Sequence, residues 1–373
     1  MGASTLAIGI DGRELAGRPT GTGRYLRSLL RHWRDGQDSL VVYFDGPPPA
    51  DPVLDHPRIR SRAIGHGSSR GLVWQQRLLP PCLYQDRVDV LFSPAYSCPL
   101  ALDLPRVTAV HDLSFFAYPQ DFAYKDGLRR RLLVGAIVGV STALLVCSDF
   151  TRRELARLFP HLAGRARHVP LGPDDDLPPA PARDAARARL GLTGPLLLTV
   201  GAILNRRCLP ELLRATALLS RAYPGLVLDV VGENRTHPGT DLTRLVSGLG
   251  LENHVRLSGF VDEAGLAARY AAADVAVFLS EYEGFGLPAL EAAARGVPLV
   301  VSRYPSLSEI FGEAALLVEP RDECAVASAL DSVLRDGRLA ERLRSSGRLL
   351  ARRYSWAETA RLTREALAEA ARP

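Results

Sequence analysis

The sequence is short of lysine and of cysteine. Lys125 is the only lysine among 46 basic residues, so any phosphate-binding site in the chain must be built from arginine. The cysteines are odd in number, scattered and without CxxC spacing, which argues against a disulfide framework or a zinc site. They are Cys82, Cys98, Cys147, Cys208 and Cys324. We therefore expect a reducing, cytoplasmic setting.

The sequence also lacks dense basic runs, and we expect no signal peptide in its first residues. The formal net charge is +5, and no run of basic residues is dense enough to indicate nucleic-acid binding. This modest excess suits an anionic substrate or a weak attraction to anionic lipid. The first residues, MGASTLAIGIDGR, have no basic region before the apolar stretch, so we interpret them as a first strand and not as a signal peptide.

The uncharged stretch at residues 132–147 is too short for a transmembrane helix. Ser141 and Thr142 divide it, and we interpret it as the buried end of a helix followed by a strand. The alternative is an interfacial segment, because three arginines at 129–131 precede it. That alternative predicts weak peripheral contact with the inner face of the membrane.

Short apolar runs alternate with longer amphipathic stretches along all 373 residues. This pattern is typical of βα units and predicts an α/β fold, with parallel sheets covered by helices on both faces. In the first half we expect strands at residues 6–10, 40–44, 88–92, 107–110 and 143–147. In the second half we expect them at residues 196–200, 227–231, 255–257, 275–279, 299–301 and 316–318.

The length favours two domains. A proline-rich stretch with an acid cluster, residues 171–184, interrupts the apolar rhythm as a domain linker does. We expect an N-terminal domain at residues 1–172, a linker at 173–190, a second domain at 191–355 and a final amphipathic helix at 356–373.

Ligands collect at the carboxyl ends of the strands in open α/β sheets. The segment EYEGFGLPALE, residues 281–291, follows one predicted strand. Gly284 and Gly286 let the main chain approach a ligand, and Pro288 suits the first turn of a helix whose N–H groups favour a diphosphate. Glu283 and Glu291 would contact two ends of one extended ligand. The alternative is a solvated loop charge and an acid favoured near a helix start.

The loop after the predicted strand at 196–200 carries Arg206 and Arg207 at the start of the next helix. Two cations at that end oppose the helix dipole. We interpret them as ligands for a diphosphate and for the charge that grows on it as it departs. A solvated pair of arginines is the alternative.

Two further features follow strands in the first half. The glycine-rich loop TGTGRY, residues 20–25, is either a plain turn or a surface where an acceptor or phosphate approaches the backbone. His111 ends the strand at 107–110, where an imidazole can hydrogen-bond a sugar hydroxyl or share a proton. A structural histidine is the alternative.

Asp174, Asp175 and Asp176 match a carboxylate pattern that some sugar transferases use to hold a metal on the diphosphate. They lie in the predicted linker and do not follow a strand, so we interpret them as structural or disordered. We expect neither a cofactor nor a metal, because Arg206, Arg207 and a helix start already meet the charge of a diphosphate.

With these residues assembled, the chain resembles the retaining GT-B glycosyltransferases of family 4 from Ile8 to the last helix. The densest matches are GTGRYLRSLL (21–30), HDLSFF (111–116), VCSDFTRREL (146–155), VGAILNRR (200–207) and EGFGLPALEAAARGVPLVVS (283–302). The resemblance implies two Rossmann-like domains facing each other across a cleft, a nucleotide-sugar donor, and a final helix that returns to the first domain.

The resemblance also implies a role for each matched residue. Glu291 would hold the ribose and Glu283 would contact the donor sugar, with His111 beside the reacting sugar. The diphosphate would be bound by Gly21, Arg206, Arg207, Phe285, Gly286 and Leu287, and the base by backbone near Gly259, Phe260 and Val261.

The resemblance also implies retention of the anomeric configuration. Glu283 and Glu291 would not act as the carboxylate pair of a retaining glycosidase, because Glu291 is needed for the ribose. The implied mechanism is same-face displacement, in which the departing diphosphate takes the acceptor's proton. Positions 207 and 208 are commonly lysine and asparagine in the family, and Arg207 and Cys208 bear on rate more than on reaction type.

The pairing of TGTGRY with HDLSFF is most similar to bacterial mannosyl- and related transferases of lipopolysaccharide O-chain or exopolysaccharide synthesis. It favours GDP-mannose as the donor, then UDP-glucose or UDP-N-acetylglucosamine, and a glycan, lipid-linked or small-molecule acceptor. Two other classes stay open. One is a nucleotide-sugar epimerase on the same fold, which would need no acceptor, and the other is a catalytically silent nucleotide-sugar-binding subunit.

Overall fold

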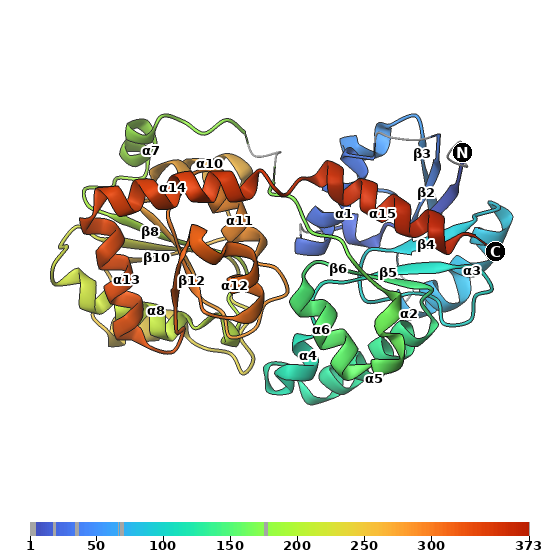
Figure 1. Ribbon diagram of the computed structural model, residues 1–373, viewed down its shortest axis with the longest axis horizontal. Helices are drawn as coiled ribbons and strands as arrows, with labels where there is room; N and C mark the ends of the chain where they lie inside the picture. Colours follow the sequence, from blue (N-terminus) through green and yellow to red (C-terminus); the bar gives the residue numbers. More distant parts are fainter. Residues whose placement is uncertain are drawn as a thin grey trace. The chain divides into compact units, whose positions relative to one another are not determined.

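The computed structural model describes residues 5–17, 20–33, 37–65, 67, 71–174 and 178–372. It divides into two compact units (Figure 1). The first comprises Met1–Leu113, Leu128–Leu171 and Ser355–Pro373, and the second comprises Ser114–Gly127 and Gly172–Tyr354. Each unit is built on one parallel sheet with helices, which confirms the predicted class of two doubly wound α/β domains.

The first unit contains a seven-stranded parallel sheet in the order β3-β2-β1-β4-β5-β6-β7. Its strands are β1 (Ala7–Asp11), β2 (Ser39–Asp45), β3 (Ile59–Ile64), β4 (Val90–Ser93), β5 (Arg106–Val110), β6 (Ala143–Val146) and β7 (Ala166–His168). Residues 40–44 of β2 are all buried, as expected of a strand covered on both faces. Apolar runs without alternation therefore mark the inner strands.

Six helices and part of a seventh belong to the first unit among the described residues. They are α1 (Gly21–Arg31), α2 (Gly71–Val73), the π-helical turn η3 (Trp74–Leu78), α3 (Leu79–Gln85), α6 (Asp149–Leu158) and α15 (Trp356–Ala370), with most of α5 (Tyr124–Val140). Short 3-10 turns η1 (Arg13–Leu15), η2 (Pro52–Asp55) and η5 (Pro160–Arg165) complete it.

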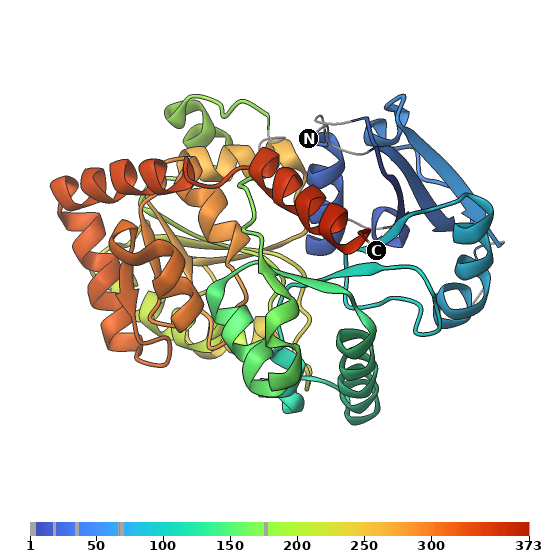
Figure 2. The ribbon, with the colours of Figure 1, turned by 45° about the vertical axis from the view of Figure 1, so that its right-hand side comes forward.

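The C-terminal helix α15 packs against α1 in the first unit (Figure 2). The rings of Trp356 and Tyr25 lie 6.0 Å apart, and both are buried. Arg364 of α15 also binds the buried carboxylate of Asp38, with 2.6 Å between Nε and Oδ2. Helix α15 begins at Trp356, the residue at which the sequence predicts the final helix.

The second unit contains a six-stranded parallel sheet in the order β10-β9-β8-β11-β12-β13. Its strands are β8 (Leu196–Val200), β9 (Val227–Val231), β10 (Val255–Gly259), β11 (Val275–Phe278), β12 (Leu299–Ser302) and β13 (Leu316–Val318). The helices are α4 (Ser114–Ala117), α7 (Arg183–Arg189), α8 (Leu209–Ser220), α9 (Leu242–Gly248), α10 (Glu263–Ala272), α11 (Leu287–Ala294), α12 (Pro305–Phe311), α13 (Glu323–Arg335) and α14 (Gly337–Ala351). The 3-10 turns are η4 (Pro119–Asp121), η6 (Asn205–Arg207) and η7 (Gly312–Ala314).

One hydrophobic cluster of the second unit packs the sheet against the helices α8 and α13, whose places Figure 1 shows. Leu212 and Leu213 of α8 and Leu330 of α13 are buried against Leu197 of β8. This packing fixes the first turn of α8 relative to the carboxyl end of β8, where the predicted diphosphate arginines lie.

Two strands of the first sheet do not appear among the predicted strands. In β3 the charged residues Arg60 and Arg62 interrupt the apolar pattern, because β3 is an edge strand in which only Ile64 is buried. The other edge strand, β7, has only three residues and no buried side chain. The strand expected at 88–92 begins at Val90, since the chain leaves α3 through Arg87, whose φ is 55°.

In two segments the described structure differs from the predicted boundaries. Residues 114–127 fall within the second unit and not within a continuous domain at 1–172. The reason is that Tyr118 donates a hydrogen bond to the Glu281 carbonyl at 3.1 Å and packs against the Tyr282 ring. The predicted linker at 173–190 includes α7, whose Arg183 and Arg187 both bind Asp274.

The stretch at 132–147 forms the end of α5 and then β6, which matches the helix-then-strand interpretation. The helix end is only partly buried, because Leu132 is 68% exposed. Within the part of the chain that the structure describes, none of the helices has the length and apolar character needed to cross a bilayer.

Candidate active site

The loop between β11 and α11 is shaped by glycine and proline. Gly286 has φ of 91°, which strains any residue with a side chain, and a Cβ there would also require Leu307 Cδ2, 2.7 Å away, to move. The helix expected from Pro288 begins at Leu287. Its first N–H groups have no acceptor within the helix and point, with the helix dipole, toward any anion bound there. Phe285 is buried against the Tyr354 ring at 5.6 Å, so the loop is anchored by an aromatic contact.

Glu283 and Arg207, which the sequence places in separate loops, form an ion pair. Glu283 Oε2 and Arg207 Nη2 lie 3.1 Å apart, and each side chain is less than a fifth exposed. The Arg207 guanidinium also lies over the Phe278 ring, 4.2 Å from its centroid. The Ser306 hydroxyl donates to the Glu283 carbonyl at 2.6 Å. The structure thus brings the predicted sugar-contacting carboxylate and a predicted diphosphate ligand together.

Both arginines belong to η6, which is held at each end by backbone contacts. Asn205 Oδ1 accepts the His237 N–H at 2.7 Å, and the Arg206 carbonyl accepts the Glu281 N–H at 2.8 Å. Near Arg206, burial raises the pKa of the Asp121 carboxyl, and the Arg206 charge opposes that rise. The turn that carries the arginines is therefore tied to the loops after β9 and β11.

Cys208 follows η6 in the left-handed region, with φ of 48° and ψ of 38°. Asparagine adopts this region more readily than most residues, which gives a physical reason for its frequency at this position in similar sequences. The Cys208 side chain is buried. Burial, together with Glu281 and Glu211, raises the pKa of the thiol to about 12.

Glu291 lies one turn inside α11 and is only 1% exposed. Its Oε2 accepts a hydrogen bond from the Tyr270 hydroxyl of α10 at 3.2 Å. The carboxylate is therefore fixed in orientation at the start of α11. Its predicted contact with a ribose stays a prediction.

The predicted base-binding segment follows β10. Gly259 has φ of 59°, and its carbonyl accepts the Gly232 N–H at 2.7 Å. Phe260 is 66% exposed, which leaves a ring face open to stacking, and Val261 is half-buried. A Cβ at Gly232 would lie 2.0 Å from the Gly201 carbonyl, so the ends of β8 and β9 approach each other closely.

In the first unit, Gly21 is the first residue of α1. The preceding Thr20 caps the helix, because its hydroxyl accepts the Gly23 N–H at 2.9 Å. A Cβ at Gly21 would meet no atom within 4 Å, whereas a Cβ at Gly23 would lie 2.4 Å from the Glu14 carbonyl. The fold of the first unit thus requires glycine at 23, and the described structure gives no steric reason for glycine at 21.

His111 follows β5 and has a defined tautomer. Its Nε2 lies 2.8 Å from the Pro94 carbonyl, which only accepts, so Nε2 carries the proton and Nδ1 of the neutral ring is an acceptor. The ring meets Tyr25 edge-on, with 4.8 Å between centroids, and Tyr96 at 5.9 Å. Burial lowers the His111 pKa, against the opposite effects of the Pro94 carbonyl and Asp112. A neutral imidazole with an available Nδ1 can accept a hydrogen bond from a hydroxyl.

A polar network at the carboxyl ends of β1 and β4 was not predicted from the sequence. Arg13 binds Asp11 through Nε and Nη2, at 2.9 and 2.6 Å. Gln75 donates to Ser97 Oγ at 2.9 Å and to Asp11 Oδ2 at 3.2 Å. Gln75 lies in the π-helical turn η3, a rare geometry that is frequent at functional sites. The sequence feature that could have indicated this network is Asp11, which directly follows the predicted strand at 6–10.

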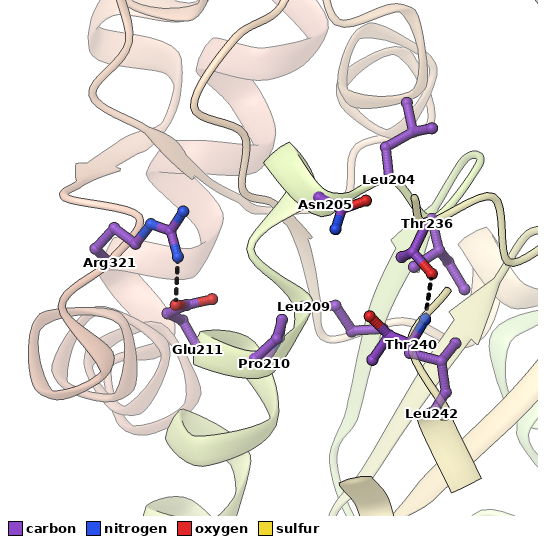
Figure 3. Close-up of a pocket in the computed structure, with 10 residues that line it drawn as sticks. Leu204, Asn205, Leu209, Pro210, Glu211, Thr236, Thr240, Leu242 and Arg321 are labelled. Atoms are coloured by element: carbon purple, nitrogen blue, oxygen red, sulfur yellow. Dashed lines mark hydrogen bonds and ion pairs between the residues drawn. The ribbon is translucent and has the colours of Figure 1, made fainter. Parts of the chain in front are cut away.

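A cavity of about 210 Å³ lies beside η6 (Figure 3). Its mainly apolar lining comes from the loop after β8, the start of α8 and the loop after β9, and includes Asn205, Pro210 and Thr236. The lining residues include none of the predicted donor contacts, so this cavity is separate from the predicted donor site.

The described residues contain no group of three or more histidine, cysteine, aspartate or glutamate side chains that could hold a metal ion. Asp175 and Asp176 lie outside the described residues. The interpretation of residues 174–176 therefore stays a prediction.

Family models match both halves of the chain. Residues 19–177 match the model described as Glycosyltransferase Family 4, and residues 182–350 match the model described as Glycosyl transferases group 1. The Escherichia coli O-antigen chain mannosyltransferase B is 29% identical over 359 residues, which cover 90% of this chain and 93% of the relative. A D-inositol 3-phosphate glycosyltransferase of Kineococcus radiotolerans is 34% identical over 292 residues, which cover 71% and 67%.

Solved structures share the fold of the whole chain. Sucrose-phosphate synthase of Thermosynechococcus elongatus has a TM-score of 0.79 at 23% identity, covering 96% of this chain and 98% of that one. HepE of Anabaena in complex with UDP-glucose has a TM-score of 0.77 at 18% identity, covering 98% and 100%. At these identities the likeness shows the GT-B fold alone. Together with the family matches, it shows that this chain belongs to glycosyltransferase family 4, a family of retaining hexosyltransferases.

Proposed function

We propose that this transferase moves a hexose, with retention of configuration, from a nucleotide-sugar donor to an acceptor hydroxyl in polysaccharide or glycoconjugate synthesis. The observation that carries the proposal is the ion pair between Glu283 and Arg207 at the start of α11. It joins a carboxylate suited to sugar hydroxyls with a guanidinium suited to a diphosphate, beside helix N–H groups that favour anions.

In this proposal each residue is assigned a role in the loop in which it lies. Glu283 contacts the donor sugar and His111 lies beside the reacting carbon, while Glu291 holds the ribose. The diphosphate ligands are Gly21, Arg206, Arg207 and the backbone of Phe285, Gly286 and Leu287, and the base lies near Gly259, Phe260 and Val261. Support comes from the positions of these residues at the carboxyl edge of their own sheets.

GDP-mannose is the proposed donor, because the E. coli relative that covers most of the chain is a mannosyltransferase of O-antigen synthesis. UDP-glucose and UDP-N-acetylglucosamine come next, since HepE is described in complex with UDP-glucose. The proposed acceptor is a glycan, a lipid-linked sugar or a small molecule bearing a free hydroxyl.

The proposed mechanism needs positioning and charge stabilisation. The acceptor hydroxyl attacks the anomeric carbon on the face from which the diphosphate departs, and a diphosphate oxygen takes the acceptor proton. Arg206, Arg207 and the α11 N–H groups stabilise the growing charge, so the reaction proceeds without a metal ion. His111 accepts a hydrogen bond through Nδ1 and holds a sugar hydroxyl in place.

The first experiment measures binding of GDP, UDP, GDP-mannose and UDP-glucose by thermal shift and calorimetry in EDTA. We expect stabilisation by GDP and GDP-mannose above that by the uridine nucleotides. Stabilisation by no nucleotide would refute the proposed site. Product analysis with donor alone then separates the classes: an epimerase converts the donor sugar, a silent subunit leaves the donor intact, and a transferase hydrolyses it slowly.

Helix α5 supports weak peripheral contact with the cytoplasmic face of a membrane. Tyr124, Leu128 and Leu132 are 78%, 39% and 68% exposed and are spaced by four residues, so they lie along one side of the helix. The basic residues Lys125 and Arg129 are exposed next to them. An apolar row flanked by cations suits the surface of an anionic bilayer.

Sedimentation with vesicles tests this contact. We expect binding to phosphatidylglycerol vesicles above binding to phosphatidylcholine vesicles, and Leu132→Glu should weaken it roughly tenfold through loss of apolar burial. Leu349→Glu is the matched control, because Leu349 is 59% exposed on α14. Equal binding by the two variants would refute a role for α5.

A further inference from the structure

Arg321 follows β13 and contacts two acidic side chains from different loops. Its Nε and Nη2 donate to the two carboxylate oxygens of Glu281, at 2.8 and 2.5 Å. Its Nη1 donates to Glu211 Oε1 at 3.0 Å, as Figure 3 shows. Arg321 therefore uses all three of its nitrogens to hold two carboxylates.

The two carboxylates flank two segments that carry proposed donor contacts. Glu281 is two residues before Glu283, and its own N–H donates to the Arg206 carbonyl at 2.8 Å. Glu211 lies in the first turn of α8, directly after η6. Arg321 thus connects the loop that carries Glu283 with the turn that carries Arg206.

We propose that Arg321 is a positioning residue, which sets the separation of the η6 turn and the 281–286 loop and thereby shapes the diphosphate site. The inference rests on the proposed function of those two loops. A bidentate guanidinium–carboxylate contact fixes both distance and orientation, which a single-point cation does not. Arg321 itself does not contact the donor in this proposal.

Because Arg321 is exposed, its removal should change the position of the two segments without lowering the stability of the fold. Its side chain is 61% exposed, and ion pairs of that exposure contribute little to the free energy of unfolding. Glu211 is almost wholly buried, but Arg214 also contacts it at 3.2 Å, so it keeps a cation when Arg321 is removed. Loss of Arg321 should therefore leave the fold intact.

The cavity beside η6 leaves one side of the turn to be held by polar contacts, among them those of Arg321 with Glu211 and Glu281. About 210 Å³ of open space adjoins Asn205, Glu211 and Arg321, so close packing does not hold η6 on that side. When the guanidinium is removed, the turn has room to shift relative to the 281–286 loop. Such a shift would change the spacing of diphosphate ligands without disturbing the core.

The test compares Arg321→Ala, Arg321→Lys and Arg335→Ala in the full chain. Arg335→Ala is the matched control, because Arg335 is 66% exposed and pairs with Asp331 within α13. Calorimetry measures binding of GDP and UDP and of the corresponding nucleosides, thermal unfolding gives Tm, and steady-state kinetics gives the donor KM and kcat.

We expect Arg321→Ala to weaken diphosphate binding and raise the donor KM by roughly fivefold to twentyfold, with nucleoside binding unchanged. The shift in Tm should be no larger than that of Arg335→Ala. Arg321→Lys should restore only part of the affinity, because lysine cannot hold Glu281 through two nitrogens. Arg321→Ala combined with Glu281→Gln should be no worse than Glu281→Gln alone, since either substitution breaks the connection between the two segments.

Two results would overturn the inference. One is unchanged diphosphate binding and KM in Arg321→Ala, and the other is an equal loss for nucleosides and diphosphates together with a fall in Tm. The wild-type protein separates this failure from failure of the proposed function. A wild type that binds neither GDP nor UDP overturns both, whereas binding that Arg321→Ala leaves unchanged overturns the positioning role alone.

Discussion

Glu283 Oε2 lies 3.1 Å from Arg207 Nη2, so the proposed sugar ligand and a proposed diphosphate ligand share one ion pair. Both side chains are less than a fifth exposed, which strengthens the interaction relative to a surface pair. A diphosphate that binds Arg207 would compete with Glu283 for the guanidinium. Donor binding would therefore loosen Glu283 from Arg207 and direct its carboxylate to the sugar.

Glu283→Gln tests this arrangement while it keeps the side-chain size. We expect kcat for transfer to fall by roughly 100-fold to 1000-fold, because the amide no longer stabilises positive charge on the reacting sugar. Affinity for GDP or UDP should stay within about threefold of wild type or rise, since Arg207 loses its competing anion. Glu319→Gln, at a side chain that is 65% exposed, is the control. Equal loss of kcat and of nucleotide affinity would contradict the separation of roles.

Arg206→Ala should weaken the binding of the diphosphate group. Loss of one charged ligand is expected to weaken GDP or UDP binding by about tenfold to a hundredfold, with guanosine or uridine binding unchanged. Calorimetry with both ligand types measures the difference. Small and equal effects of Arg206→Ala and Glu283→Gln on all ligands would refute both assignments.

Gly21 and Gly23 provide a pair of substitutions with opposite expectations. Gly23→Ala places a Cβ 2.4 Å from the Glu14 carbonyl, and we expect a loss of about 1 to 3 kcal/mol in the free energy of unfolding. Gly21→Ala meets no atom within 4 Å, so stability should be kept or slightly raised, because alanine favours helices. If Gly21 lies beneath the diphosphate, the donor KM of Gly21→Ala should rise severalfold. Urea unfolding and donor kinetics on both variants test these expectations. An unchanged donor KM in Gly21→Ala would contradict a contact between Gly21 and the diphosphate.

The inner strands of both sheets were predictable because they are mostly apolar runs ended by glycine, serine, proline or aspartate. Residues 196–200 and 227–231 agree to the residue with the inner strands β8 and β9, and residues 316–318 agree with β13, an edge strand of the second sheet. The edge strands β3 and β7 of the first sheet were not predictable by the same rule, since β3 carries the charged residues Arg60 and Arg62 and β7 has only three residues. Apolar continuity reports burial on both faces, and these two strands lack it.

Some residues of the candidate site were likewise predictable from the sequence and others were not. Gly286 and Pro288 were identifiable because their backbone properties have local causes. The contacts of Tyr118 and Arg321 with Glu281 were not, because they join segments 163 and 40 residues apart and follow no short motif. Only the packing of the second unit reveals them.

The cysteines should differ widely in reactivity. Cys324 is exposed, whereas Cys208 and Cys98 are buried, and burial raises their pKa values to about 12 and about 11. At pH 8 these buried thiols are almost wholly protonated and shielded, so the thiolate that reacts is scarce. We expect rapid alkylation of Cys324 in the native protein and labelling of Cys208 only after unfolding, as read by peptide mass spectrometry. Fast native labelling of Cys208 would contradict the geometry of the turn that carries Arg206.

His111 should remain neutral below the pH at which a free histidine gains its proton. Burial lowers its pKa, and the unfolded chain titrates near the ordinary value of about 6.5. Above that pH both states are neutral and the histidine makes no pH-dependent contribution. As pH falls below about 6.5, the unfolded state binds the proton first, so the free energy of unfolding must decrease.

Two measurements check this expectation. The His111 Cε1 proton, assigned by its absence in His111→Gln, should titrate below pH 6.5 in the folded protein. The wild type should also lose more stability than His111→Gln between pH 7.5 and pH 5.5 in urea unfolding. Because Nε2 is committed to the Pro94 carbonyl, only Nδ1 can meet a sugar hydroxyl, and protonation of Nδ1 would turn that acceptor into a donor. A His111 pKa above 6.5 in the folded protein would mean that the fold favours the charged ring. The proposed role of Nδ1 as an acceptor would then fail.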